Sequence, residues 1–288
     1  MKIALGSVQF GCNYGISNQL GQVSHTEIGN ILALAKQHNI TVIDTAPAYG
    51  DSESRLGRQS IASDFNFVSK IAPDCEPQHI IASCQHSLAQ LKTKQLSALM
   101  LHHGKQLLGV NGDNIYQELV IAKQQQLTAK IGCSVYSAQE AITLSKKFPL
   151  DIVQIPANIF DQGIFANNAL QQLAEQKIEV HIRSLFLQGV IFLEPAALPP
   201  ALKPLRIKLK HLNTLAQQQN NHDITTAKIA VALAPFIKES TINKLVIGCC
   251  STGELQQIIT AYELAKTITY DFSQFAEADE NIINPSRW

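Results

Sequence analysis

The fold is indicated by a pattern of a short apolar strand followed by a turn into a helix. This pattern is clearest in the stretch Thr41-Val42-Ile43-Asp44-Thr45-Ala46-Pro47-Ala48-Tyr49-Gly50. Residues 41–43 are rich in β-branched side chains, which predicts a short buried strand. Asp44 places a carboxylate at the end of this strand, where a charge is costly to bury without a partner. A proline and a glycine then break the strand, and Tyr49 lies in the turn between them. One strand-to-helix turn therefore presents a carboxylate and a phenol together.

The same alternation of a short apolar strand and a helical segment continues along the chain. Seven further strands are predicted at residues 3–8, 65–71, 98–104, 130–135, 151–156, 178–184 and 244–249. Ser-x-x-Glu capping boxes at Ser24, Ser137 and Ser251 predict where three of the helices begin. Alternating strands and helices imply a parallel sheet. Eight such units in 288 residues predict the α/β class and a single (β/α)8 TIM barrel.

The predicted barrel is one domain, residues 1–288, because no linker or shift in composition divides the chain. A long loop segment at 185–221 follows the seventh strand, holds four prolines and is predicted to contain one extra helix near 208–219. The competing architecture is a doubly wound open sheet that binds a dinucleotide. It is disfavoured because no Gly-x-Gly-x-x-Gly run follows the first strand.

The composition argues against several classes of protein. Hydrophobic residues make up 45% and charged residues 16%, so enough apolar surface is available for a sizeable core. Lysine plus arginine number 23 and aspartate plus glutamate 23, which gives a net charge of zero. Without a basic cluster, neither nucleic acid nor an anionic membrane surface is an expected partner. No apolar run reaches the length of a membrane span.

The cysteines and the first residues indicate a cytoplasmic protein. Six cysteines are spread along the chain without Cys-x-x-Cys spacing, so no zinc site is predicted. The adjacent Cys249 and Cys250 end an apolar run and are interpreted as buried thiols, which suits a reducing compartment. The first residues contain too few apolar side chains for a signal peptide.

Side chains suited to proton transfer stand at the ends of three consecutive predicted strands. Asp44, Lys70 and His102 occupy these ends, and Tyr49 reaches in from the turn above the second strand. In a (β/α)8 barrel the carboxyl ends of the strands form the active site. A nearby ammonium lowers the pKa of a phenol from about 10, a carboxylate keeps that ammonium charged, and an imidazole can polarise a substrate oxygen. Together the four residues predict a proton-transfer site.

Each of these residues, taken alone, has a simpler interpretation. An Asp–Lys pair is more often a structural ion pair than a catalytic one, and a turn tyrosine is often only half-buried packing. Of the two neighbouring histidines, His102 shares the strand face of Met100, whereas His103 points to the opposite face. We select His102 for this reason. The convergence of four positions on one barrel mouth favours function over packing.

Four segments resemble the aldo-keto reductase family. Residues 44–50, Asp-Thr-Ala-Pro-Ala-Tyr-Gly, resemble its Asp-Thr-Ala-x-x-Tyr-Gly signature. Residues 67–70, Phe-Val-Ser-Lys, and 99–102, Leu-Met-Leu-His, are similar to the strands that carry the catalytic lysine and histidine of the family. Residues 5–11, Leu-Gly-Ser-Val-Gln-Phe-Gly, are similar to its first strand. The resemblance covers most of the chain and implies the same eight-fold barrel.

The resemblance implies an activity for the predicted site. Members of the family reduce carbonyl groups with NAD(P)H, so hydride would pass from the nicotinamide to the carbonyl carbon while Tyr49 donates the proton. Lys70 would tune Tyr49, Asp44 would hold Lys70, and His102 would position the carbonyl. The expected partner is a small-molecule carbonyl compound.

The resemblance also assigns cofactor-binding positions. They are Ser134, Gln154, Arg183, Ser184, Leu185, Gly189, Gly248, Ser251 and Glu254. Ser134 and Gln154 would face the nicotinamide carboxamide, and the backbone after Ser184 would meet the pyrophosphate. Arg183 stands where many members have a stacking tyrosine, and a planar guanidinium can stack as well as pair.

The adenosine-phosphate segment departs from the family pattern. Residues 247–251 resemble this segment, but the arginine or lysine often found there is Cys250. A 2′-phosphate therefore loses one charge-assisted contact, although Ser251 and the N-terminus of the following helix can still bind a phosphate. NADPH is the implied cofactor, with NADH as the alternative and a weaker preference between the two than is usual in the family.

The candidate pocket residues favour a polar substrate. They are Phe10, Tyr14, His103, Asn158, Phe160 and Phe186. The polar groups of Arg183 and Asn158 favour a sugar-like carbonyl compound over a steroid or a bulky aromatic compound. The Arg-Ser-Leu-Phe-Leu-Gln-Gly run at 183–189 resembles relatives associated with carbohydrate metabolism, which points the same way.

Two other functions are consistent with the sequence. A catalytically weak barrel that serves as a regulatory or partner-binding subunit would bind nucleotide without turnover. A non-redox barrel enzyme, such as an isomerase that uses Asp44 and Lys70, would bind no nicotinamide. The intact set of four side chains favours the reductase over both. The physiological substrate, the reaction direction and the oligomeric state are left open.

Overall fold

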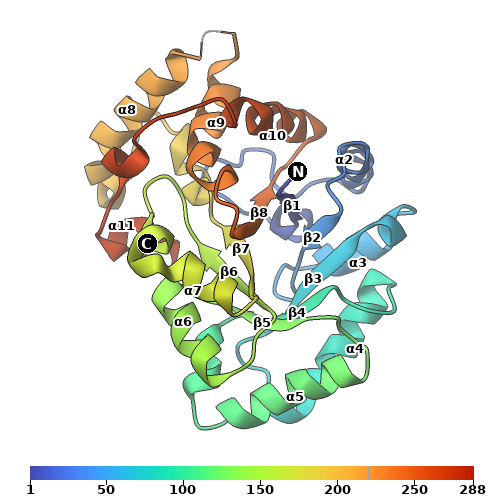
Figure 1. Cartoon of the computed structure of the whole chain (residues 1–288). Helices are drawn as coiled ribbons and strands as arrows, with labels where there is room; N and C mark the ends of the chain where they lie inside the picture. The colour runs from blue at the N-terminus through green and yellow to red at the C-terminus, as the bar shows by residue number, and fades with distance from the viewer. Residues whose placement is uncertain (220) are drawn as a thin grey trace.

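The computed structural model describes residues 1–219 and 221–288 and contains eight parallel strands that close into a barrel (Figure 1). Each strand pairs with the next along the chain, and the last pairs with the first. The strands are β1 Ile3–Gly6, β2 Val42–Asp44, β3 Asn66–Ile71, β4 Ala98–Leu101, β5 Ile131–Ser134, β6 Ile152–Pro156, β7 Glu179–Arg183 and β8 Ile242–Gly248. The predicted (β/α)8 TIM barrel is confirmed, with strand bounds within a few residues of those expected.

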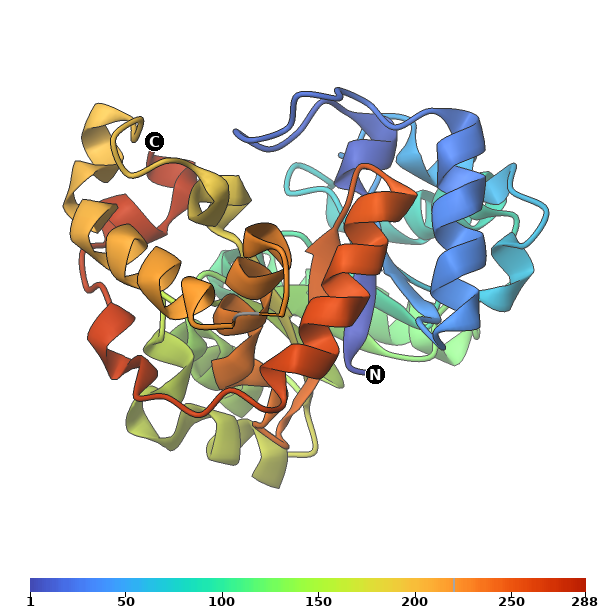
Figure 2. The ribbon, with the colours of Figure 1, turned by 90° about the horizontal axis from the view of Figure 1, so that it is seen from above.

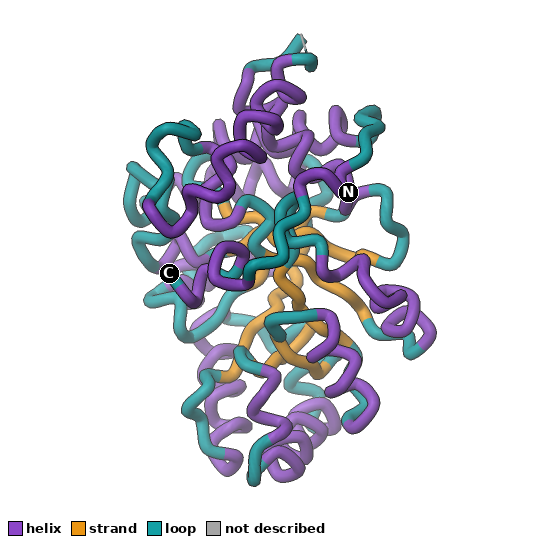
Figure 3. The backbone as a smooth tube through the Cα atoms, turned by 90° about the vertical axis from the view of Figure 1, so that its left-hand side faces the viewer, coloured by secondary structure: helices purple, strands orange, loops and turns teal. Residues whose placement is uncertain are grey.

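Helices surround the barrel, as the tube view with its central strands makes clear (Figure 3). The α-helices are α1 Val8–Gly11, α2 His25–Gln37, α3 Ser52–Gly57, α4 Ile80–Leu91, α5 Gly112–Gln124, α6 Ala138–Lys147, α7 Ala169–Glu175, α8 Arg206–Gln217, α9 Ile224–Ile237, α10 Thr252–Ala265 and α11 Glu280–Ile283. Short 3-10 helices are η1 Ala62–Asp64, η2 Pro77–His79, η3 Gly104–Leu108, η4 Gly163–Asn168, η5 Leu187–Phe192, η6 Pro200–Leu205, η7 Phe272–Phe275 and η8 Pro285–Arg287. Within the described residues, no helix combines the length and the apolar character needed to cross a bilayer.

Three helices begin at the predicted capping boxes. Ser24, Ser137 and Ser251 each accept a hydrogen bond from the backbone N–H three residues later, at the starts of α2, α6 and α10. At α10 the carboxylate of Glu254 also accepts from the backbone N–H of Cys250, at 2.6 Å. Each cap of this kind stabilises a helix start by about 1 kcal/mol. The caps therefore place these helices precisely after their strands.

The first predicted strand and the segment after the seventh differ in detail from expectation. The strand predicted at 3–8 ends at Gly6, because Ser7 precedes the helical turn α1, which was not predicted. After β7, the long segment carries η5, η6 and the extra helix, seen as α8 at Arg206–Gln217.

Two segments that follow strand ends meet on one side of the barrel. Residues 12–24, drawn in blue, extend toward the gold segment after β7 (Figure 2). The backbone N–H of Ile16 donates to the carbonyl oxygen of Gln188 at 3.1 Å. Gly189 has φ +98° and a Cβ on it would lie 2.0 Å from the Ser17 hydroxyl, so only glycine permits this approach. Because both segments leave the carboxyl ends of their strands, they cover the mouth expected to hold the active site.

The interior of the barrel is tightly filled at its centre. Val68, Ala98, Met100 and Ile152 form a buried cluster separate from the larger core between strands and helices. Gly132 lies in register with Met100 on one side and Ile152 on the other. A Cβ on Gly132 would stand 1.8 Å from the carbonyl oxygen of Ile152. The barrel closes at this level only because β5 carries no side chain there.

We expect Gly132→Ala to lower the free energy of unfolding by about 2–4 kcal/mol, since the β5–β6 pair must move apart to admit the methyl group. Urea unfolding followed by circular dichroism measures the change. Gly253→Ala, in the first turn of α10, is the matched control. Its nearest neighbour would be the Ser251 hydroxyl at 3.7 Å, so its stability should not fall. Equal losses in the two variants would contradict this account of Gly132.

Candidate active site

Asp44, Lys70 and Tyr49 come together at the carboxyl ends of β2 and β3. The ammonium of Lys70 donates to the two carboxylate oxygens of Asp44 at 2.6 and 2.7 Å and to the carbonyl oxygen of Thr45 at 3.0 Å. It also lies 3.4 Å from the hydroxyl of Tyr49. Lys70 is 1% exposed and Asp44 3%. The pair is therefore buried, and each charge depends on the other.

The turn that carries Tyr49 is held by two close backbone contacts. Gly50 has φ +58°, and a Cβ on Gly11 would lie 1.7 Å from the carbonyl oxygen of Tyr49. Ser52, the first residue of α3, donates its hydroxyl to the Ser7 carbonyl at 2.9 Å. These contacts tie the turn after β2 to the turn after β1. They fix the phenol above the ends of β2 and β3.

His102 completes the group of four. It follows β4, and its backbone N–H still bonds to the Ile71 carbonyl at 3.0 Å, so it continues the strand. The rings of His102 and Tyr49 stand edge to face with centroids 5.8 Å apart. His103 turns instead toward Tyr136, whose hydroxyl lies 3.4 Å from its Nε2. The structure thus brings the four predicted side chains into one group.

The environment sets the protonation of these groups. Burial raises the pKa of the Tyr49 hydroxyl, and the Lys70 cation opposes this only in part. The lowering of the phenol pKa that the sequence analysis expected from Lys70 is therefore outweighed by burial. For Lys70, burial is the largest influence and lowers the pKa, but Asp44 and Tyr49 together raise it more, so the amine stays charged. Burial first, and then the Lys70 cation, lower the pKa of His102 to about 4. At neutral pH, the mouth therefore presents a protonated phenol and a neutral imidazole.

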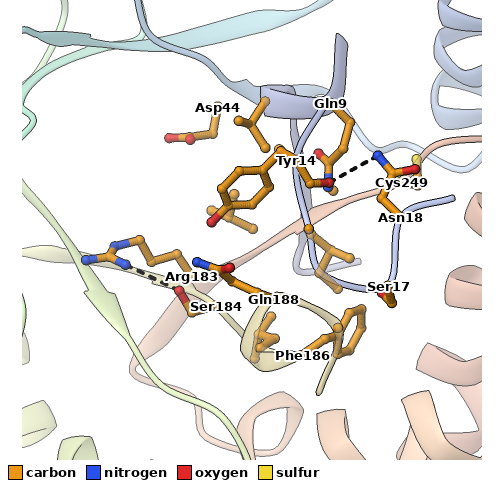
Figure 4. Close-up of a pocket in the computed structure, with 18 of the residues that line it drawn as sticks. Gln9, Tyr14, Ser17, Asn18, Asp44, Arg183, Ser184, Phe186, Gln188 and Cys249 are labelled. Atoms are coloured by element: carbon orange, nitrogen blue, oxygen red, sulfur yellow. Dashed lines mark hydrogen bonds between the residues drawn. The ribbon is translucent and has the colours of Figure 1, made fainter. Parts of the chain in front are cut away.

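A pocket of about 620 Å³ opens beside this group. Its lining includes Asp44, Tyr49 and His102. Figure 4 shows Asp44 and Arg183 on one side of the pocket and Cys249 on the other. Much of its wall comes from the segments after β1, β7 and β8, so strand ends far apart in the chain build one cavity.

Nearly all of the predicted cofactor positions line this pocket. They are Ser134, Gln154, Arg183, Ser184, Leu185, Gly189, Gly248 and Glu254. Ser251 is not among the described lining residues, because its hydroxyl faces the backbone N–H of Glu254 as the cap of α10. The amide of Gln154 donates to Asp44 at 2.8 Å, so it also supports the buried carboxylate.

The candidate substrate residues are divided between pocket and core. Tyr14 and Phe186 line the pocket. Phe10 and Phe160 are 0% exposed and pack in the core, so their assignment to the pocket is wrong. Asn158 is also buried, and its side-chain amide oxygen holds the following turn by accepting the backbone N–H groups of Phe160 and Asp161. Apolar character alone could not separate the wall of the pocket from the packing behind it.

Tyr136 lines the pocket but was missed by the sequence analysis. Its ring lies under the guanidinium of Arg183, whose Cζ is 5.1 Å from the ring centroid. A usable signal was present, because Tyr136 follows Ser134 by two residues, the spacing of side chains on one strand face.

A closed (β/α)8 barrel with titratable side chains at the carboxyl ends of its strands is the architecture of barrel enzymes. A sequence model of the Aldo/keto reductase family matches residues 2–280. The chain belongs to this family. No group of three or more metal-binding side chains occurs in the part of the chain that the structure describes.

Solved structures share the fold. One from Pseudomonas aeruginosa, described as an aldo-keto reductase, is 19% identical, with a TM-score of 0.65 over 92% of this chain and 91% of that one. An aldo-keto reductase from Bacillus halodurans in its holo form is 15% identical, with a TM-score of 0.74 over 100% of this chain and 95% of that one. At these identities the similarity shows the fold alone. No curated protein sequence matches the chain significantly.

The lowered pKa of His102 predicts a loss of stability in mild acid. An unfolded histidine binds a proton below about pH 6.5, whereas the folded one does so only near pH 4, so stability falls as the pH drops between these values. His102→Gln removes this contribution. The loss in unfolding free energy from pH 7 to pH 5 should shrink by about 1–2 kcal/mol in the variant.

Urea titrations at the two pH values measure this difference. His79→Gln, at an exposed position on η2, serves as the control and should keep the pH dependence of the wild type. A His102 variant with the same acid sensitivity as the wild type would refute the buried neutral imidazole.

Proposed function

We propose that the protein is a single-domain cytoplasmic oxidoreductase that reduces an aldehyde or ketone to an alcohol with NADPH or NADH. The observation that carries the proposal is the position of the Lys70 ammonium, between the carboxylate of Asp44 and the hydroxyl of Tyr49 on the pocket wall. Membership in the aldo/keto reductase family supports an oxidoreductase role.

In the proposed mechanism, Tyr49 donates the proton to the carbonyl oxygen. Because its pKa is raised, the hydroxyl is protonated at neutral pH and available as an acid. The buried Lys70 cation stabilises the phenolate that forms, and Asp44 keeps the ammonium in place. The neutral imidazole of His102 can donate an N–H to the same carbonyl oxygen. A bound dihydronicotinamide would supply hydride to the carbonyl carbon.

Two features of the pocket fit a dinucleotide. Its volume of about 620 Å³ is within the range of cofactor sites, roughly 300–1,000 Å³. The buried side-chain oxygen of Gln9 has no partner among the described residues, and Gly248 lies so close that a Cβ would come within 2.4 Å of it. A buried hydrogen-bond acceptor on Gln9, next to a glycine that leaves space at Gly248, is suited to a polar ligand that donates a hydrogen bond.

Under this proposal, Ser134 and Gln154 hold the nicotinamide end and the turn from Ser184 through Leu185 to Gly189 holds the pyrophosphate. Gly248, Ser251 and Glu254 lie at the adenosine end, and Arg183 offers a planar face to the nicotinamide. These roles follow the family resemblance, and all of the residues named except Ser251 line the pocket.

We expect Tyr49→Phe to lower kcat for small aldehydes by about 10²–10⁴-fold, because the proton donor is removed. The dissociation constant of NADPH, measured by nicotinamide fluorescence, should stay near that of the wild type. Tyr116→Phe is the matched control, since its hydroxyl bonds to the Pro149 carbonyl outside the pocket. Loss of NADPH absorbance reports turnover.

The same measurements separate the proposal from its alternatives. NADPH binding without reduction of any carbonyl compound would favour the regulatory nucleotide-binding protein. Absence of nicotinamide binding would favour a non-redox barrel enzyme. Full activity in Tyr49→Phe would overturn the assigned proton donor.

The preference for NADPH over NADH is expected to be weak, because the α10 end of the pocket offers no basic side chain among its described lining residues. Burial raises the pKa of the Cys250 thiol to about 11 and also raises that of Cys249, so both thiols are neutral, and the carboxyl group that lines this end is Glu254. Cys250→Arg should strengthen NADPH binding relative to NADH by about tenfold through a charge-assisted contact with the 2′-phosphate. Cys75→Arg, outside the pocket, should leave the ratio unchanged. An unchanged ratio in Cys250→Arg would place the 2′-phosphate elsewhere.

A further inference from the structure

The guanidinium of Arg183 is held in a fixed place at the mouth of the barrel. Its Nε donates to the hydroxyl of Ser134 at 3.3 Å, and its two terminal nitrogens donate to the Ser184 hydroxyl at 3.3 Å and the Val135 carbonyl at 3.1 Å. One face rests against the ring of Tyr136. The position of the positive charge is therefore defined before any ligand binds.

This charge forms no ion pair with a carboxylate among the described residues. The described pocket lining contains two carboxylic acids, Asp44 and Glu254, and one arginine, Arg183. Asp44 is neutralised by Lys70. Glu254 is used at the α10 cap, where its carboxylate accepts the backbone N–H of Cys250. A charge in a partly enclosed pocket is costly without a partner, so an unpaired arginine points to an anionic ligand.

Asp161 lies near enough to Arg183 to be influenced by its charge, but no ion pair joins the two within the described residues. Arg183 lowers the pKa of Asp161, but burial raises it more, to about 6. The carboxylate of Asp161 instead accepts a hydrogen bond from the backbone N–H of Gly163. Asp161 does not line the pocket, so the guanidinium faces the cavity without it.

The donors left on the guanidinium suit an oxyanion. A guanidinium carries five N–H groups, and three are used by Ser134, Ser184 and Val135. One N–H therefore remains on each terminal nitrogen without an acceptor in the described chain. Paired N–H groups of this kind bind carboxylate or phosphate oxygens with high geometric selectivity.

A row of ring contacts links Arg183 to the proton donor, and all of its members except His103 line the pocket. From Arg183 the row runs through Tyr136 and His103, with ring centroids 5.7 Å apart, and through His103 and His102, 5.8 Å apart. His102 then meets Tyr49 at 5.8 Å. Tyr49, His102 and Arg183 line the same pocket, and the Arg183 charge lowers the pKa of both Tyr49 and His102, so a small molecule with its carbonyl oxygen at Tyr49 can also contact the guanidinium.

We propose that Arg183 binds an oxyanion of the substrate, so that the preferred substrates are aldehydes or ketones that carry a carboxylate or a phosphate. This inference rests on the proposed reductase function and narrows its substrate class. The cofactor pyrophosphate is a second oxyanion of the same chemistry, and the experiment is designed to separate the two.

Matched substrate pairs provide the test. We compare kcat/KM for 4-oxobutanoate with that for butanal, and for glyceraldehyde 3-phosphate with that for glyceraldehyde. For at least one pair, kcat/KM of the wild type should be about 10- to 100-fold higher for the anion than for the neutral analogue. The neutral analogue leaves the buried polar site without a hydrogen-bond partner, which lowers kcat/KM. Arg183→Gln should abolish this preference mainly through KM, and Arg183→Lys should keep part of it. Arg58→Gln, at an exposed position, should behave as the wild type.

Binding without turnover gives an independent measurement. Succinate or inorganic phosphate should raise the Tm of the wild-type protein without nucleotide, and should not do so in Arg183→Gln. This result does not depend on catalysis, so the inference can be tested even if no aldehyde is reduced. Absence of all turnover would instead defeat the proposed function.

Two outcomes would overturn the role of Arg183 toward substrate. One is equal kcat/KM for charged and neutral members of both pairs in the wild type. The other is an Arg183→Gln variant in which all four substrates lose activity equally while the NADPH dissociation constant rises, which would assign the guanidinium to the pyrophosphate. A preference confined to one pair supports the proposal and identifies the oxyanion as carboxylate or phosphate.

Discussion

The buried ion pair of Asp44 and Lys70 is the constraint on which the rest of the mouth depends. Two charges removed from water need each other and further hydrogen bonds to be tolerated. The structure provides these through the Thr45 carbonyl, the amide of Gln154 and the hydroxyl of Tyr49. Three strands and one turn are thereby fixed to a single polar centre. The same demand for partners places the phenol beside a cation.

Much of this arrangement could be predicted from the sequence. The alternation of short apolar strands with capped helices was sufficient to predict the barrel, because few other topologies are compatible with it. The inward face of His102 followed from its spacing to Met100, and the rule of strand ends placed it with Asp44 and Lys70. Local pattern was sufficient because each of these residues lies at the end of a regular strand.

The remainder depended on contacts between distant parts of the chain. Phe10 and Phe160 are buried in the core and do not face the pocket. Residues far away in the sequence determine this, so the local sequence could not predict it. The raised pKa of Tyr49 reflects the depth of the site, which outweighs the lysine that the sequence had suggested. The link between Tyr136 and Arg183 joins the ends of β5 and β7, and no motif encodes it.

The closure of β8 against β1 has a consequence for synthesis of the protein. The ion pair is encoded within residues 44–70, so it leaves the ribosome early. The cavity wall at residues 246–258, in contrast, is among the last parts translated. A nascent chain therefore contains Asp44 and Lys70 long before the residues that complete the cavity have been translated. A chain truncated before β8 lacks the strand that pairs with β1, so its sheet cannot close into a barrel and its pocket is incomplete.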